Sequence, residues 1–455
     1  MARNGLKRSD FKGLELPMDG FEVLETYKRR YSTIYRVRVQ PDDLDIMVKR
    51  FSYAQGMTST SRKFNDPSLA HYRETGINKI LSEADPSVAL KLIPQFLGYN
   101  KEHLLYFREW VHGDCHRKKF AAIEKEKFSA LQGENTDEVR RVRDKLDEAK
   151  MVLVYEAMDM IARFHAYCEQ YSANFANRIN LEDAPVNQQV RVYAKYLTRL
   201  AYFHHFKEIM VKEGKAKGQI RKKLGVNIDK MAGQLIRKGR KAMNDTNEVG
   251  IIHGDLNAAH VLDKLIDFED VRKGKLILDP TRYLIDENTK IPVEQIPFVI
   301  AYYEGQKAFY RGELTGEVER VHDVDELARL VNDVIGKENF AQAYVTYLAT
   351  AIEQTIHIAA VRTKYSPGQI NDLLRQCPTY KLQDIHTAQL KRLASNLDFY
   401  FGSQGLPIRQ GIGRGEKRVT GYLDFIRRLL FNDLQLLKTA NDSQWWSWKI
   451  FDEEK

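Results

Sequence analysis

The sequence predicts an α+β protein in two parts, a small antiparallel sheet near the N-terminus followed by a larger helical part. Between residues 21 and 111, short runs alternate apolar and polar side chains, as strands with one buried face do. After residue 136, apolar positions recur every three or four residues, which is typical of helices that bury one side. With 455 residues and 43% hydrophobic content, the chain is long enough for two or three packed units.

The net charge of +9 is concentrated in one segment. Residues 207–241 contain twelve lysines and arginines against three acidic residues, so this segment accounts for the whole excess. It is either a site for an anionic partner or the solvated face of an inserted helical pair. The three cysteines are far apart, and no apolar segment follows a basic start. These features predict a cytoplasmic protein with no membrane partner.

Three strands are predicted to open the sheet. Runs 21–27 and 34–39 alternate, and the basic turn that separates them contains Ser32. The third run, 45–51, reads Asp-Ile-Met-Val-Lys-Arg-Phe, a short apolar strand with Lys49 set inside it. A lysine inside an apolar strand is costly unless its amine meets an anion. The alternative is an edge-strand lysine whose amine reaches water.

A helix and two more strands follow. Helical spacing of apolar residues over 71–83 puts Glu74 on the apolar side, with Glu83 at the far end. Runs 95–99 and 104–111 flank a polar turn, and the second continues as Glu-Trp-Val-His-Gly-Asp through residue 114. A charged stretch, 115–136, precedes a long helix over 139–164, whose end reads Ile-Ala-Arg-Phe-His-Ala.

The most informative stretch is the polar loop within residues 251–262. Ile251 and Ile252 lead into His253-Gly254-Asp255, and Val261-Leu262 lead out of it, so a carboxylate is held between apolar anchors. Phosphoryl transfer to a hydroxyl needs a carboxylate that takes or orients the proton, and shortly after it a metal-holding group. The alternative is a turn in which the glycine supplies the backbone conformation.

The order of these segments resembles that of the aminoglycoside and choline phosphotransferases, which have a protein-kinase-like fold. The resemblance covers roughly residues 20–285 and is most specific at 109–114 and 253–255. It implies an N-lobe over 21–111 and a helical C-lobe over 112–440 that includes the basic insertion at 207–241. An N-terminal extension, 1–20, and a tryptophan-rich tail, 441–455, complete the chain.

The same resemblance implies an ATP-dependent kinase that transfers the γ-phosphate to a hydroxyl of a small metabolite or antibiotic-like acceptor. Asp255 is the implied catalytic residue. Five residues are implied to bind the nucleotide: Lys49 on the phosphates, Glu74 (or, as a weaker candidate, Glu83) beside it, Ser32 in the phosphate-covering turn, and Glu109 and Val111 at the adenine.

Two aspartates compete for the role of metal ligand. Asp279 is favoured because it ends an apolar run, 274–279, with 265–273 as the tip of a hairpin. Asp267 follows His260 by seven residues, which leaves room only for a two-residue turn. Its local spelling, Ile-Asp-Phe-Glu, nevertheless resembles the family.

His260 stands where the family has asparagine, and it is the second implied metal ligand. Because Mg²⁺ prefers hard oxygen donors, three outcomes stay open. They are a preference for Mn²⁺ over Mg²⁺, reliance on Asp279 alone, or loss of catalysis. The last would leave a kinase-fold binding protein that uses residues 207–241 to hold a phosphorylated or nucleic-acid partner.

Overall fold

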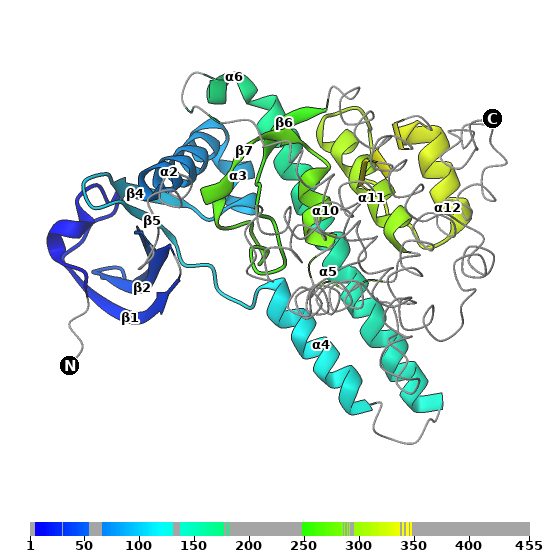
Figure 1. Cartoon of the computed structure of the whole chain (residues 1–455), viewed down its shortest axis with the longest axis horizontal. Coiled ribbons are helices and arrows are strands. Elements are labelled where there is room, and N and C mark those ends of the chain that lie inside the picture. Colours follow the sequence, from blue (N-terminus) through cyan, green and yellow to red (C-terminus); the bar gives the residue numbers. More distant parts are fainter. Residues whose placement is uncertain are drawn as a thin grey trace, which may run out of the picture. The chain divides into compact units, whose positions relative to one another are not determined.

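A five-stranded antiparallel sheet forms the N-terminal part of the protein, with strand order β1-β2-β3-β5-β4 (Figure 1). The computed structural model describes residues 5–29, 31–53, 66–130, 137–176, 248–284 and 295–336, with isolated residues at 179, 181, 286, 289, 291 and between 339 and 347. The chain divides into two units, which are considered separately. Unit 1 comprises Met1–Ala122, Asp159–Ala184 and Val249–Asp279, and unit 2 comprises Ile123–Met158, Pro185–Glu248 and Pro280–Lys455.

The predicted strands and the predicted first helix are confirmed. The elements before the polar loop are η1 (Arg8–Phe11), β1 (Gly20–Lys28), β2 (Ser32–Gln40), β3 (Leu44–Phe51), α2 (Pro67–Ala84), α3 (Pro86–Leu92), β4 (Phe96–Asn100), β5 (Leu105–Glu109), α4 (His116–Ala130), α5 (Asp137–Gln170) and α6 (Ser172–Ala176). The charged stretch after residue 114 is therefore largely helical, and the predicted long helix is α5.

The outer face of the sheet is covered by the N-terminal extension. Leu6 and Phe11 are buried there among β2, β3 and β5, and the Phe11 ring stacks on Phe107 at 5.8 Å. Asp10, beside them, accepts a hydrogen bond from Arg50 at 2.8 Å. The extension is thus part of the core of unit 1.

The inner face of the sheet packs against α2. The helix begins with Asp66 as N-cap, whose carboxylate accepts from the Ser68 amide at 2.8 Å, and Pro67 occupies the first turn. Directly paired residues of antiparallel strands point to the same face. Because Lys49 pairs with Tyr106, and Met47 with Arg108, all four side chains lie on this inner face.

A second, two-stranded sheet frames the polar loop. Strand β6 (Val249–Ile252) precedes the loop and pairs with β7 (Arg272–Lys275), which follows the short helix η2 (Phe268–Asp270). Helix α10 (Leu278–Leu284) then begins. A strand was expected over the apolar run 274–279, but only residues 274 and 275 belong to one, and Asp279 lies in the first turn of α10.

Unit 2 is helical in its described part, with α11 (Ile296–Tyr310), α12 (Val324–Arg329) and the π-helical turn η4 (Leu330–Ile335). Lys307 on α11 is buried and binds Glu304 at 2.7 Å and Glu248 at 2.5 Å. None of the helices in the described part of the chain combines the length and apolar character that crossing a membrane requires.

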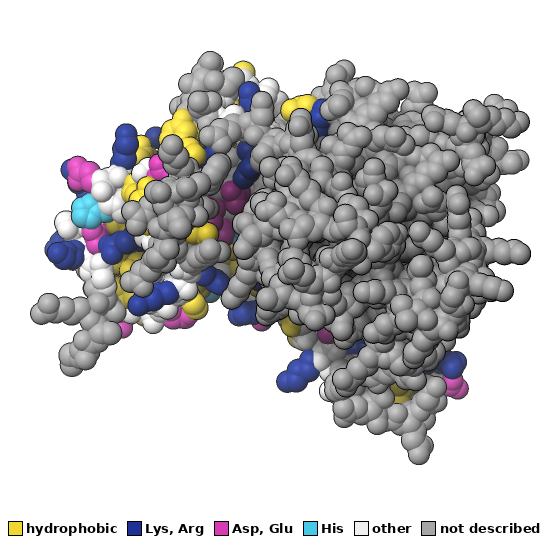
Figure 2. All heavy atoms as spheres, in the orientation of Figure 1, with side chains coloured by type: hydrophobic (Ala, Val, Ile, Leu, Met, Phe, Trp, Pro, Cys, Tyr) yellow, Lys and Arg dark blue, Asp and Glu magenta, His cyan; other side chains and the backbone are white. Residues whose placement is uncertain are grey.

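Lys/Arg and Asp/Glu side chains are interspersed on the face of unit 1 that Figure 2 shows. The basic segment 207–241, residues 348–440 and the tryptophan-rich tail lie outside the described residues. The expectations for these three segments therefore stay predictions.

Candidate functional site

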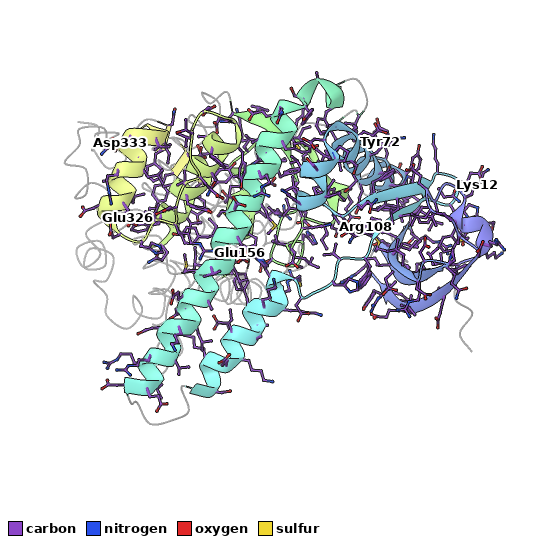
Figure 3. The ribbon with its side chains drawn as sticks, turned by 180° about the vertical axis from the view of Figure 1, so that it is seen from behind. Lys12, Tyr72, Arg108, Glu156, Glu326 and Asp333 are labelled. Carbon is purple, nitrogen blue, oxygen red and sulfur yellow. The ribbon has the colours of Figure 1, made fainter. Side chains whose placement is uncertain are left out.

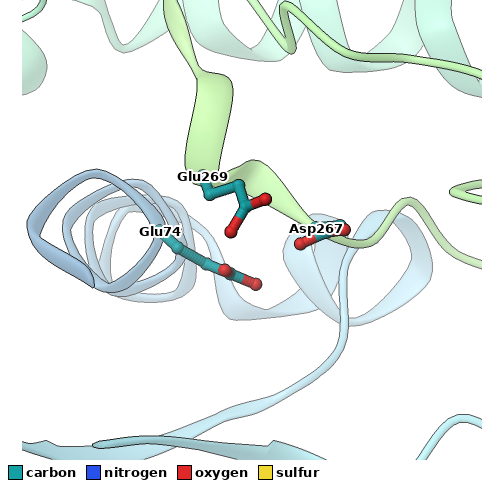
Figure 4. Close-up of side chains that lie close together, drawn as sticks. All are labelled: Glu74, Asp267 and Glu269. Atoms are coloured by element: carbon teal, nitrogen blue, oxygen red, sulfur yellow. The ribbon is translucent and has the colours of Figure 1, made fainter. Parts of the chain in front are cut away.

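The amine of Lys49 is surrounded by three carboxylates in unit 1. Its Nζ lies 2.7 Å from Glu74 Oε2 and 3.4 Å from Glu269 Oε2, and it also donates to Asp267 Oδ1. Lys49 comes from β3, and the two other acids flank Phe268 in the sequence. Figure 4 shows Glu74, on α2, pointing toward Asp267 and Glu269. The structure thus brings together the predicted lysine and glutamate. Glu83 is a surface residue 3.8 Å from Lys79.

Lys49 and Asp267 stay charged because each lies beside groups of opposite charge. Burial alone lowers the pKa of Lys49, but the three carboxylates outweigh it and keep that pKa well above its ordinary value. Burial raises the pKa of Asp267, and the opposing effect of Lys49 and His260 brings it below its usual range. Asp267 is therefore ionised at neutral pH and available to bind a cation.

Glu269 behaves differently, because burial and the neighbouring acids raise its pKa to about 7. We expect the stability that goes with protonated Glu269 to be fully present below the ordinary pKa of 4.5. It should be lost as the pH rises through about 7 and the buried carboxyl group ionises. Glu269→Gln should therefore stabilise the protein at pH 8 by on the order of 2 kcal/mol more than at pH 5. Thermal unfolding at both pH values measures this difference. Glu83→Gln, at the exposed end of α2, is the control, and an equal effect of Glu269→Gln at the two pH values would contradict the assignment.

The loop that carries Asp255 is fixed by hydrogen bonds to Asp279 and by a bond within the loop. The amides of His253 and Gly254 donate to the two oxygens of Asp279, at 2.7 and 3.0 Å. Gly254 has φ of 85°, and a Cβ there would meet the Asp270 carbonyl oxygen at 2.1 Å, so only glycine fits. The Asp255 carbonyl accepts from Asn257 Nδ2 at 3.1 Å. The backbone that presents the Asp255 carboxylate is therefore anchored on both sides.

Asp279 anchors the loop, and its surroundings differ from those of Asp267. Besides the two amides, its carboxylate binds His165 Nε2 at 2.9 Å and is 1% exposed. Burial raises the pKa of Asp279, but the bonds from His165 and the amides bring it below its ordinary value. Its oxygens are thus committed to protein groups, whereas Asp267 faces Lys49 and His260. His165 is itself buried.

The short spacing between His260 and Asp267 does not prevent them from meeting. Val261 and Leu265 form an antiparallel bridge, and the Leu262 amide donates to the Lys264 carbonyl at 3.1 Å. The tight turn that was taken to disfavour Asp267 is the one the chain makes. Asp267 itself has φ of 73°, a left-handed conformation that aspartate tolerates better than most residues.

His260 lies between Asp255 and the acidic cluster around Lys49. Its Nδ1 is 2.7 Å from the Asp255 carbonyl oxygen, so Nδ1 carries a proton and donates. Its Nε2 lies 3.3 Å from Asp267 Oδ2. Two ligands at right angles on a metal with bonds of about 2.1 Å would be about 3.0 Å apart. The pair therefore fits a divalent cation, and Glu269 offers a further oxygen close to Asp267.

The other predicted nucleotide-binding residues lie along the inner face and its edge. Ser32 begins β2, where it is buried and pairs with Phe51. Glu109 ends β5, and its carboxylate accepts from Lys264 Nζ at 2.5 Å and from the Gln95 amide at 2.8 Å. Val111 follows two residues later. Their roles stay predictions.

Two residues of this site were missed from the sequence, Glu269 and Arg108. Glu269 is part of the Ile-Asp-Phe-Glu run, but it was given no role there. Arg108 lies inside the apolar run of β5, which is the same signal that singled out Lys49.

No family model and no curated protein matches the chain. Solved structures similar to it include a choline kinase from Cryptosporidium parvum Iowa II, with a TM-score of 0.39 and 10% identity over 86% of this chain and 90% of that one. An ethanolamine kinase from Plasmodium vivax has a TM-score of 0.31 and 12% identity over 83% of this chain and 82% of that one. The predicted α+β class is confirmed, with an antiparallel sheet first and helices after it.

Proposed function

We propose that this protein is a small-molecule kinase, which transfers the γ-phosphate of a nucleoside triphosphate to a hydroxyl group. The observation that supports this best is the buried ion pair between Lys49 and Glu74, next to Asp267. A fully buried lysine among acids of a helix and a loop is what phosphate binding beside a metal ion requires. From the resemblance described above, the expected nucleotide is ATP, and the expected acceptor is a small metabolite or antibiotic-like alcohol.

In this mechanism Lys49 binds the α- and β-phosphates and Glu74 keeps its amine in place. Asp255 orients the acceptor hydroxyl and takes its proton as the phosphoryl group leaves the β-phosphate. The anchored backbone on either side of Asp255 limits the reorganisation that the carboxylate undergoes. Burial lowers the pKa of His253, which keeps this histidine neutral.

Asp267, His260 and Glu269 would hold the divalent cation. When bound, the cation neutralises charge on the phosphate oxygens. Asp267 contributes the ionised oxygen, and its other oxygen stays on Lys49, so the metal site and the phosphate-binding lysine share one carboxylate. Loss of either partner should therefore disturb both functions.

The test is a phosphorylation screen with a panel of small alcohols, amino alcohols, sugars and aminoglycosides. Each is incubated with labelled triphosphates, with Mg²⁺ or with Mn²⁺, and Asp255→Asn serves as the inactive control. Transfer to one acceptor class by the unaltered protein, and not by Asp255→Asn, supports the proposal. Triphosphate binding without any turnover, together with salt-dependent RNA binding, would favour the binding-protein alternative instead.

His260→Asn should change the metal preference of the site. An imidazole nitrogen favours Mn²⁺ over Mg²⁺ more than an amide oxygen does. We expect the ratio of Mn²⁺ to Mg²⁺ affinity to fall by about tenfold in the variant. Competition between the two ions, followed by electron paramagnetic resonance of Mn²⁺, measures this ratio without turnover. His103→Asn, on the turn between β4 and β5, is the control; an unchanged ratio in His260→Asn would show that His260 is not a ligand.

A further inference from the structure

Arg108 is a buried cation that the mechanism above does not use. It lies on β5, on the same face of the sheet as Lys49, one residue before Glu109 (Figure 3). The residue is 9% exposed. Its Nε is buried and finds no hydrogen-bond partner within the part of the chain that the structure describes. A guanidinium has five N–H donors and no acceptor, so this side chain can donate to a ligand acceptor besides its bonds within the protein.

Arg108 also changes what the connector after β5 offers to a base. Its Nη1 donates to the Glu109 carbonyl oxygen at 3.1 Å. The Glu109 amide donates to the Gln95 carbonyl at 3.0 Å, and the Trp110 amide donates to the Asp45 carbonyl at 3.2 Å. The Glu109 carbonyl was the acceptor expected to receive the amino group of adenine. In this protein Arg108 already donates to that carbonyl oxygen and so places a donor-only group beside it.

The two purines differ at the position that would meet this group. Adenine carries a 6-amino donor, whereas guanine carries a 6-oxo acceptor. A 6-amino group would bring donors toward the donors of Arg108, while a 6-oxo group would accept from them. Because a buried donor left without a partner is costly, the difference in binding affinity between the two bases should be large.

We infer that Arg108 selects a 6-oxo purine, so that the protein uses a guanine nucleotide in preference to an adenine nucleotide. This inference rests on the proposed function, because it assumes that the base binds beside the connector. Arg108 would act as a specificity-determining residue, with its guanidinium donating to the 6-oxo group and its contact with Glu109 fixing its direction. Neither the acceptor nor the metal enters this argument.

The test compares the binding of GTP, ITP and ATP to the full chain by calorimetry, without an acceptor. ITP has the 6-oxo group of guanine but lacks its 2-amino group. We expect GTP and ITP to bind about tenfold or more tightly than ATP. Binding of ATP as tightly as GTP would overturn the inference and leave the kinase proposal standing. Binding of GTP but not of ITP would assign the selection to another residue, and binding of none of them would overturn both proposals.

Arg108→Met removes the donors and keeps an unbranched side chain. We expect its preference for GTP and ITP over ATP to fall to about threefold or less, with a gain for ATP as the Glu109 carbonyl is released. Arg50→Met is the matched control, since Arg50 is on β3 with its guanidinium bonded to Asp10 on the outer face. If Arg108→Met retains the full preference, or if Arg50→Met loses it equally, the inference fails. The comparison of the three triphosphates on the unaltered protein decides the question even if Arg108→Met does not fold.

Discussion

Asp255→Asn is expected to lower phosphotransfer by about 10²- to 10⁴-fold, the usual contribution of a positioned general base. An asparagine has nearly the same shape, but it cannot accept the hydroxyl proton. The loop conformation should persist, because hydrogen bonds to the Asp255 carbonyl and to Asp279 hold it. Turnover of the acceptor found in the screen, together with calorimetric nucleotide affinity, separates the two effects.

The control for this variant is Asp263→Asn. Asp263 lies in the nearby turn, where its carboxylate is 76% exposed and pairs with Lys119 at 3.5 Å. It should retain activity, because a surface pair of this kind contributes little. If Asp255→Asn keeps full turnover, or loses nucleotide affinity to the same degree as turnover, Asp255 is not the proton acceptor.

Asp267→Asn and Asp279→Asn should affect different properties, metal binding in the first variant and stability in the second. Asp267→Asn should abolish binding of the divalent cation and lower phosphotransfer by about 10³-fold or more. Asp279→Asn should instead lower the free energy of unfolding by about 3 kcal/mol, because an amide nitrogen would face groups that donate to Asp279. Denaturant unfolding and metal titration on both variants test this. The reverse result, with stability lost at Asp267 and metal binding lost at Asp279, would restore the preference drawn from the sequence.

The sheet and its first helix were predictable because their signals are local. Strands β1 and β2 alternate in polarity, β3 is a short apolar run, and α2 has helical spacing after a proline at its start. The pairing of Lys49 with Glu74 followed from the resemblance, and the cost of leaving a buried amine without an anion supports it. For the strands and the helix the signal lies within a few residues. For Lys49 it lies in the apolar residues beside it on the strand.

The region after the loop was less predictable, because its signals are ambiguous. Leu276 and Ile277 are buried as a strand would be, yet they lie between β7 and α10. A short apolar run does not distinguish a strand from a buried connection. The choice between Asp267 and Asp279 depended on long-range contacts with Lys49 and His165, which no local pattern contains.

The bridge between Val261 and Leu265 has a consequence for protein engineering. Ile266 is tied to the loop on both sides, since its amide donates to the His260 carbonyl at 3.0 Å and its carbonyl accepts from His253 Nε2 at 2.8 Å. Lengthening the turn at 262–264 by even one residue would pull these bonds out of register and displace Asp267 relative to Asp255. Attempts to redesign which alcohol is phosphorylated should therefore leave this turn intact and introduce sequence diversity elsewhere.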